Sequence, residues 1–167
     1  DQVEHRLVMV REMLQPVMAE RTRSSIVIAA DPGAVLDVIA DLESYPEWAP
    51  EFTEIEILAE DGDGWPDQVR MSLDATAVKD TYVLDYDWDV AEDGTGTVSW
   101  HLVEATVLKA LDGAYVLAQH DGGTEVTYDL TVDVRIPMLG MLKRKAEKVI
   151  IDTALKNLKK RVESLTE

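Results

Sequence analysis

The sequence predicts an α+β domain in which an antiparallel sheet is covered by one long helix near the C-terminal end. From residue 51 to 134 apolar and polar side chains alternate, and glycine-containing turns fall at 60–64, 92–96 and 120–123. This pattern is typical of a meander of about six strands. Residues 140–166 then carry apolar side chains at helical spacing and predict a helix of roughly 40 Å. An apolar sheet face needs a cover, which this helix can supply.

The first residues are set apart from this domain. Apolar residues at helical spacing open the chain, namely Val3, Leu7, Val10, Leu14 and Val17. Pro16 should end that helix. Residues 1–19 are therefore expected to form an N-terminal extension, either a helix that packs on the domain or on a partner, or a segment outside the folded unit. Residues 20–167 form the domain.

A first strand and two short helices are expected before the meander. Residues 23–29 alternate as in a strand, and Asp31 followed by Pro32 is typical of an N-cap and first helical position. The stretch "SYPEWAPEF" (44–52) follows, where Pro46 and Pro50 are expected to end short helical turns. Tyr45 and Trp48 should plug one end of the molecule, as a hydrophobic cap or as a mobile gate.

Within the meander, one phase of each strand is apolar and rich in large rings. Its members include Met71, Tyr82, Leu84, Tyr86, Trp88, Trp100, Tyr115 and Tyr128. The other phase is polar and should face water. Asp80 is the exception, because it falls in the apolar phase. A carboxylate there must be paired, hydrated or shifted upward in pKa, so it is either a polar anchor or acid–base group, or a residue left in water by a bulge.

Composition excludes several classes of function. The net charge is −17, and because residues 138–167 hold eight basic and four acidic side chains, the remainder carries −21. This balance argues against nucleic-acid binding. The chain has no cysteine, which removes thiol nucleophiles and zinc-thiolate sites. The apolar runs are too short for stable membrane insertion, so a cytoplasmic location is expected. The basic C-terminal helix is either a solvated face or a surface that docks on anionic headgroups or ligand carboxylates.

Several segments in order resemble a known family. They are "ADP" at the first helix, "YPEW" after it, "GAYVL", "GGTEVTY" and "IPMLGMLKRKAEKVIIDTALKNLKKRVE". Over about residues 20–166 the chain resembles the START-like, SRPBCC superfamily, and within it the actinobacterial polyketide cyclase/dehydrase-like proteins. The resemblance implies a helix-grip fold, with a curved sheet of six to seven strands around the C-terminal helix and a hydrophobic cavity between them.

The predicted cavity combines the inward rings with the corner and the long helix. Its residues are Tyr45, Trp48, Met71, Tyr82, Leu84, Tyr86, Trp88, Trp100, Tyr115, Tyr128, Leu142, Ala146 and Ile150. The weak catalytic candidates are Asp80, Tyr82 and Tyr86. Arg135 is a further possible partner for a carboxylate or enolate, whereas Arg70 falls in the solvent phase. The three scattered histidines make neither a metal site nor a triad, so no metal and no cofactor are expected.

Two functions remain open. The first is binding of a hydrophobic small molecule, such as a lipid, polyketide or isoprenoid-like compound. The second is a polyketide cyclase, aromatase or dehydratase that positions a poly-keto chain in the same cavity. In either case the protein is expected to be a monomer or a weak homodimer.

Overall fold

The computed structural model describes residues 21–75, 78–136 and 140–166, so the extension predicted at 1–19 lies outside the described residues. The elements follow one another in the order β1 (Thr22–Ile28), α2 (Pro32–Ala40), the 3₁₀ turn η1 (Leu42–Ser44), α3 (Tyr45–Trp48), β2 (Phe52–Glu60), β3 (Pro66–Asp74), β4 (Lys79–Val90), β5 (Gly96–Ala105), β6 (Leu108–His120), β7 (Gly123–Val134) and α4 (Gly140–Leu165). The predicted order of elements is confirmed.

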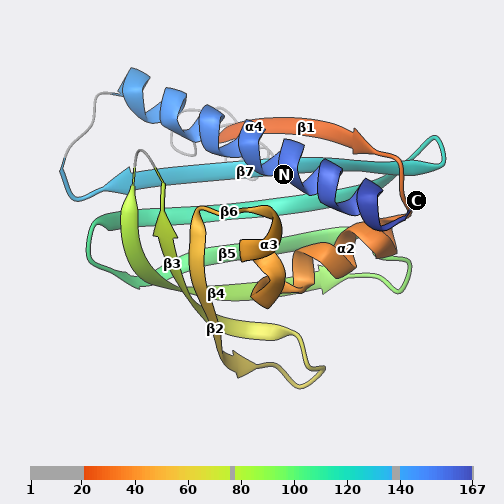
Figure 1. Cartoon of the computed structure of the whole chain (residues 1–167), viewed down its shortest axis with the longest axis horizontal. Helices are drawn as coiled ribbons and strands as arrows, with labels where there is room; N and C mark the ends of the chain where they lie inside the picture. The colour runs from red at the N-terminus through yellow and green to blue at the C-terminus, as the bar shows by residue number, and fades with distance from the viewer. Residues whose placement is uncertain (1–20, 76–77, 137–139, 167) are drawn as a thin grey trace, which may run out of the picture.

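The seven strands form one antiparallel sheet in the order β1-β7-β6-β5-β4-β3-β2. Each strand of the meander from β2 to β7 pairs with its neighbours in sequence. The last of them, β7, also pairs with β1. Figure 1 shows β2 and β3 running steeply across the other strands, with α4 along β1 and β7. On the same side of the sheet, α2 contacts β6 and β7, and α3 contacts β2. The helix-grip arrangement expected from the sequence is therefore confirmed.

One hairpin turn fixes the position of α2. Gly94, between β4 and β5, has a φ of 92°, which favours glycine. A Cβ at this position would lie 2.4 Å from the backbone nitrogen of Gly33 in the first turn of α2. The backbones of the hairpin and the helix are thus in direct contact, and this contact holds α2 at one end of the sheet.

The buried stripe of α4 differs from the predicted one. Its buried residues are Glu147, Ile151, Leu155, Leu158 and Val162. Leu142, which was predicted to line the cavity, is 55% exposed, and the apolar side chains of Val149 and Leu165 are 59% and 60% exposed. The inward side predicted from apolar spacing is right at Leu158 and Val162 but wrong at Leu142, Val149 and Leu165. The true stripe includes a glutamate, which no search for apolar periodicity would place inside.

Glu147 joins α4 to the sheet. Its carboxylate accepts hydrogen bonds from the hydroxyl of Thr22 and the backbone N–H of Val132, both at 2.7 Å. Val132 lies beyond the part of β7 that pairs with β1. The carboxylate therefore satisfies a strand N–H that the shorter edge strand does not reach.

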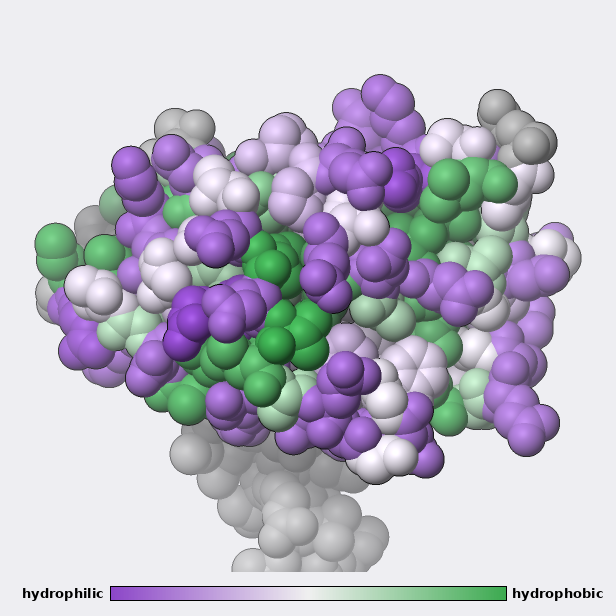
Figure 2. All heavy atoms as spheres, turned by 60° about the horizontal axis from the view of Figure 1, so that its bottom comes forward, coloured by the Kyte–Doolittle hydropathy of each residue, from purple (hydrophilic) through white to green (hydrophobic). Residues whose placement is uncertain are grey.

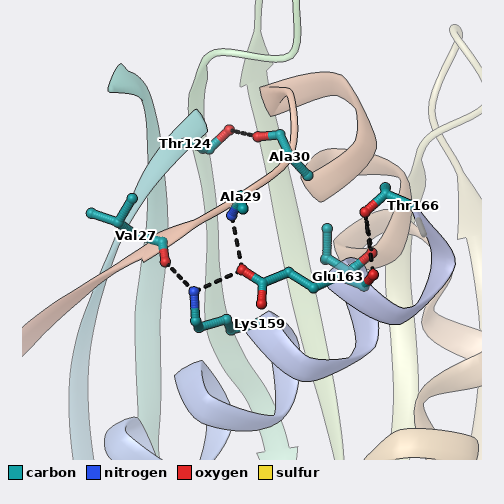
Figure 3. A network of polar contacts seen from close by, with 8 residues as sticks. Val27, Ala29, Ala30, Thr124, Lys159, Glu163 and Thr166 are labelled. Atoms are coloured by element: carbon teal, nitrogen blue, oxygen red, sulfur yellow. Dashed lines mark hydrogen bonds and ion pairs between the residues drawn. The ribbon is translucent and has the colours of Figure 1, made fainter. Parts of the chain in front are cut away.

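The far end of α4 caps the edge of β1. The ammonium of Lys159 donates to the carbonyl of Val27 and to Glu163, both at 2.7 Å, and the N–H of Ala29 donates to Glu163 at 2.9 Å (Figure 3). These side chains occupy backbone groups that an edge strand otherwise offers to another chain. They also fix the register of the helix against the sheet.

The corner after α2 folds differently from the expectation in one respect. Pro46 lies in the first turn of α3, where its missing N–H costs nothing, so it begins a helical turn and does not end one. Asp31 occupies the N-cap position of α2 but makes no side-chain cap bond. The hydroxyl of Tyr45 donates to the carbonyl of Ile39 at 2.5 Å, which ties the corner to α2.

No helix among the described residues has the length and apolar character needed to cross a membrane.

Candidate ligand-binding site

The inner face of the sheet carries a group of aromatic side chains from four neighbouring strands. They are Tyr82, Tyr86 and Trp88 on β4, Trp100 on β5, Tyr115 on β6 and Tyr128 on β7. Strand register places Tyr86 opposite Trp100 and Tyr115 opposite Tyr128. Because side chains alternate along a strand, these pairs point to the same side of the sheet. The inward phase predicted from the sequence is thus the phase that the structure has.

Most of these rings touch one another in a continuous series. It runs from Trp65 to Trp88 (5.0 Å between ring centroids), Tyr86 (5.5 Å), Trp100 (5.8 Å) and then to Tyr115 (5.3 Å). Trp100 also contacts Tyr128 edge-on at 5.7 Å. Trp65 was not predicted to belong to this group, because it lies in the turn before β3, where strand alternation does not apply.

A glycine makes room for the central ring of the series. A Cβ on Gly113 of β6 would lie 2.6 Å from the ring of Trp100, its partner across the strand pair. Any other residue at this position would displace the ring. The indole therefore lies directly over Gly113, in contact with the rings of Tyr86, Tyr115 and Tyr128.

Four tyrosine hydroxyls in this group have no hydrogen-bond partner among the described residues, namely those of Tyr82, Tyr86, Tyr115 and Tyr128. In the same part of the chain, every fully enclosed side-chain nitrogen or oxygen does have such a partner. The four hydroxyls are consequently not fully enclosed, and each borders space that a water-sized molecule can reach. Because the rings themselves are largely buried, the inner face presents polar groups to space within an apolar surrounding.

Burial keeps these tyrosines protonated. Desolvation is the main cause that raises the pKa of Tyr82, Tyr86, Tyr115 and Tyr128 above the usual 10.0, and for the first three the neighbouring tyrosines add to it. A neutral phenol is a hydrogen-bond donor as well as an acceptor. The group can therefore donate to oxygen atoms of a ligand, but it has no phenolate to act as a base near neutral pH.

Asp80 is buried but already saturated with hydrogen bonds. Its carboxylate accepts from the backbone N–H groups of Val107 (2.8 Å), Leu108 (2.9 Å) and Thr106 (3.2 Å), and from that of Thr81 (2.8 Å). Desolvation raises the pKa of Asp80, but the four N–H groups together outweigh it and the pKa is lowered. Of the alternatives drawn from the sequence, pairing is confirmed and an upward shift is wrong, because most of the partners come from a loop far along the chain.

The other candidate polar residues hold backbone or surface groups. The guanidinium of Arg135 donates to the carbonyls of Thr106 (2.8 Å) and Ala105 (3.3 Å), so Asp80 and Arg135 fix the same β5–β6 loop from two sides. Arg70 is exposed and pairs with Glu56 at 3.2 Å. Within the described ranges, no group of three or more histidine, aspartate or glutamate side chains could hold a metal ion.

Two hollows lie at the surface beside α2, and the four tyrosines of the inner face are not among the residues that line them. One, of about 300 Å³, lies between α2, α3 and the end of α4 and includes Trp48 and Arg161. The other, of about 320 Å³, lies between the end of α2 and the β2–β3 hairpin and includes Trp65. Figure 2 shows hydrophobic side chains in the middle of a face that hydrophilic side chains surround. Trp65 joins its hollow to the series of rings through Trp88, whereas the ring of Trp48 contacts that of Tyr45 in the corner.

The remaining predicted cavity residues have mixed outcomes. Met71 and Leu84 are buried in the core, and Ala146 and Ile150 are half-buried. Leu142 faces solvent, so its predicted place in the cavity was wrong. Ile151 and Leu155, which the sequence analysis missed, are the buried residues of α4 at this level. Whether Trp48 acts as a cap or as a gate stays a prediction.

Comparison with known proteins gives the family. A family model described as polyketide cyclase / dehydrase and lipid transport matches residues 28–159. Among solved structures, a START superfamily protein from Mycobacterium smegmatis has a TM-score of 0.78 at 23% identity, over 87% of this chain and 98% of that chain.

Two further structures share this fold. A protein from Thermus thermophilus has a TM-score of 0.72 at 25% identity, over 88% of this chain and 99% of that chain. The Zhui aromatase/cyclase from Streptomyces sp. R1128 has a TM-score of 0.68 at 17% identity, over 88% of this chain and 95% of that chain. Because the family model runs from the last residue of β1 into α4 and so matches more than half of the chain, the chain belongs to the polyketide cyclase/dehydrase and lipid transport family.

Proposed function

We propose that the protein binds a neutral hydrophobic small molecule that carries oxygen atoms, such as a lipid, polyketide or isoprenoid-like compound, against the inner face of the sheet. The observation that carries this proposal is the set of four tyrosine hydroxyls without partners among the described residues. Within the described residues these hydroxyls have no protein partner, so they are free to bond to water or to a ligand that occupies the adjoining space. A ligand with carbonyl or hydroxyl oxygens would supply the missing hydrogen bonds while the rings cover its apolar parts.

The charges of the interior favour a neutral ligand over an acid. Among the described residues, the buried charged side chains are Asp80, Asp129 and Glu147, all of them acidic. Each is already engaged: Asp80 and Glu147 by hydrogen bonds from the chain, and Asp129 by Arg23 on the outer face. A ligand carboxylate would therefore find phenol donors but no buried cation in this part of the chain, and burying an unpaired charge is expensive. We accordingly expect a free fatty acid to bind worse than a neutral ketone, quinone or alcohol of similar size.

The test uses competition against a neutral fluorescent probe, N-phenylnaphthylamine. A naphthoquinone should displace the probe better than methylnaphthalene, which has the same rings without oxygen. Tyr115→Phe and Tyr128→Phe should each weaken the quinone by up to roughly tenfold, about 1.4 kcal/mol, and leave methylnaphthalene unchanged. Tyr45→Phe is the matched control, because its hydroxyl already bonds to Ile39 and its loss should not affect the quinone.

Two results would contradict the proposal. The first is that the protein fails to bind any neutral probe. The second is that the tyrosine substitutions lower the affinity for the quinone and for the hydrocarbon equally. Native mass spectrometry of the purified protein, followed by organic extraction, would identify a ligand that copurifies.

A second candidate is a cyclase or aromatase that acts on a poly-keto chain by positioning it. The observation that favours it is the clustering of protonated phenols, which can stabilise a developing enolate oxygen by hydrogen bonding. Asp80 is a poor proton donor or acceptor here because its lone pairs are occupied. Turnover of a polyketone surrogate that falls in Tyr86→Phe while probe affinity is kept would support this candidate over simple binding.

A further inference from the structure

The outer side of α4 carries a stripe that combines exposed apolar side chains with lysines. Leu142 and Val149, seven residues apart, are 55% and 59% exposed, and Met141 at the flank is 77% exposed. Lys145, Lys156 and Lys160 are exposed on the same side, since steps of three, four and seven residues keep side chains on one helix face. This stripe lies opposite the buried stripe that contains Ile151 and Leu158.

These lysines are not used to hold the fold. Lys148 and Lys159 pair with Asp152 and Glu163 one turn further along α4. Asp152 lies on the same side as the stripe, but its charge is balanced by Lys148 at 2.8 Å. By contrast, Lys145, Lys156 and Lys160 make no ion pair or hydrogen bond in the part of the chain that the structure describes. These three lysines are therefore available to an outside partner, and they alternate along the helix with the exposed Leu142 and Val149.

The charge of the rest of the chain makes this stripe distinctive. Residues 138–167 carry +4 and the remainder −21. A protein with this distribution is repelled by an anionic surface in most orientations and attracted in the one that presents α4. Cations alone would suit many polyanions, but exposed leucine, valine and methionine between them suit a surface into which apolar side chains can enter.

We propose that the outer stripe of α4, formed by Met141, Leu142, Lys145, Val149, Lys156 and Lys160, docks the protein on a bilayer surface with anionic headgroups. The helix stays packed on β1 and β7, so only side-chain tips enter the headgroup region. Binding is then mainly electrostatic, because two or three apolar side chains contribute little on their own. It is independent of what the inner face binds.

The experiment measures the fraction of the full chain that sediments with vesicles. One set of vesicles contains phosphatidylcholine alone, and the other contains phosphatidylcholine mixed with phosphatidylglycerol. We expect binding only to the mixed vesicles, and loss of binding when ionic strength rises and the Debye length shrinks from about 10 Å to about 3 Å. Lys145→Gln with Lys156→Gln should weaken binding by roughly tenfold. Leu142→Ser with Val149→Ser should weaken it less.

Lys79→Gln with Lys109→Gln is the matched control, because both lysines are exposed on strands and the pair removes the same charge. It should bind vesicles like the wild type. Equal binding to both kinds of vesicle, no binding to either, or an equal loss in this control would overturn the proposal. So would light scattering that shows a dimer broken by Lys145→Gln with Lys156→Gln, since the stripe would then be an interface between copies. Uptake of the neutral probe should be unchanged in all these variants, which separates this test from that of the proposed function.

Discussion

A carboxylate that faces an apolar interior can transfer a proton only if it keeps an oxygen lone pair available to the substrate. Asp80 does not, because four backbone N–H groups occupy its two oxygens. Its position in the inward phase of β4 is therefore explained by the loop that it holds. The carboxylate links the start of β4 to the N–H groups of the β5–β6 loop. Arg135 holds the same loop by donating hydrogen bonds to its carbonyl groups.

Asp80→Asn should lower the free energy of unfolding by about 2 kcal/mol at neutral pH, because hydrogen bonds to a charged acceptor are strong and an amide NH₂ would face other N–H donors. The measurement is urea unfolding. Asp87→Asn, on the exposed side of the same strand, is the control and should change stability by less than about 0.5 kcal/mol. Asp80→Asn should leave uptake of the neutral probe nearly unchanged. If this variant lost probe uptake or turnover while keeping its stability, Asp80 would act directly on the ligand.

The pH dependence of that stability difference follows from the lowered pKa of Asp80. A group with a lower pKa in the folded state binds fewer protons there than in the unfolded state. Its contribution is complete above the ordinary value of 3.8 and is lost as pH falls through the lower folded value. The gap between wild type and Asp80→Asn should therefore narrow in acid, as followed by unfolding at a series of pH values. A gap that widens in acid would mean that the pKa is raised.

At the scale of the element, α4 shows where helix periodicity is informative and where it is not. Its length and its place over the sheet follow from the sequence, but its rotation does not. Leu142 and Val149 are seven residues apart, a spacing typical of buried residues on a helix, yet both are exposed. Glu147 lies inside because its carboxylate accepts hydrogen bonds from Thr22 and Val132. Contacts between residues far apart in the chain decide such a phase, and a single sequence does not display them.

The rotation of α4 can be tested directly with two substitutions. Ile151→Ala should cost about 3 kcal/mol of unfolding free energy, because the side chain is fully buried against the sheet and its removal leaves a cavity. Val149→Ala, two residues away, should change stability by less than about 0.5 kcal/mol. Thermal or urea unfolding of both variants gives the comparison. Equal costs would mean that the helix is rotated from the position described.

The strands were predictable for the opposite reason. One face of the sheet is buried and the other is wet, so period-two alternation specifies both the strand and its inward side, and Tyr82, Tyr86, Trp100, Tyr115 and Tyr128 were found in this way. Trp65 was missed because it lies in a hairpin, where no phase exists. Which tyrosine hydroxyls lack a partner among the described residues could not be predicted either, because hydrogen bonds between distant segments are not visible in a single sequence.

For the whole molecule, the distribution of tyrosine is as informative as that of charge. All five tyrosines of the chain belong to the inner face or to the corner beside it. Desolvation raises the pKa of each, and neighbouring tyrosines add to this for all but Tyr128. The folded protein thus has no tyrosine that ionises in the ordinary range, so phenol ionisation and unfolding are coupled across the whole domain.

A titration in alkali should therefore show one cooperative transition. The unfolded chain loses phenolic protons near pH 10.0 while the folded chain keeps them, so stability is complete below this pH and falls as pH rises beyond it. Tyrosinate absorbance and the loss of far-ultraviolet circular dichroism should coincide, and in concentrated urea the tyrosines should titrate near the ordinary value. A tyrosine that ionises before the dichroism changes would show that its ring is open to solvent.

A ligand that accepts hydrogen bonds from the phenols binds only their protonated form. A saturating naphthoquinone should therefore move the alkaline transition to higher pH, and methylnaphthalene should move it less.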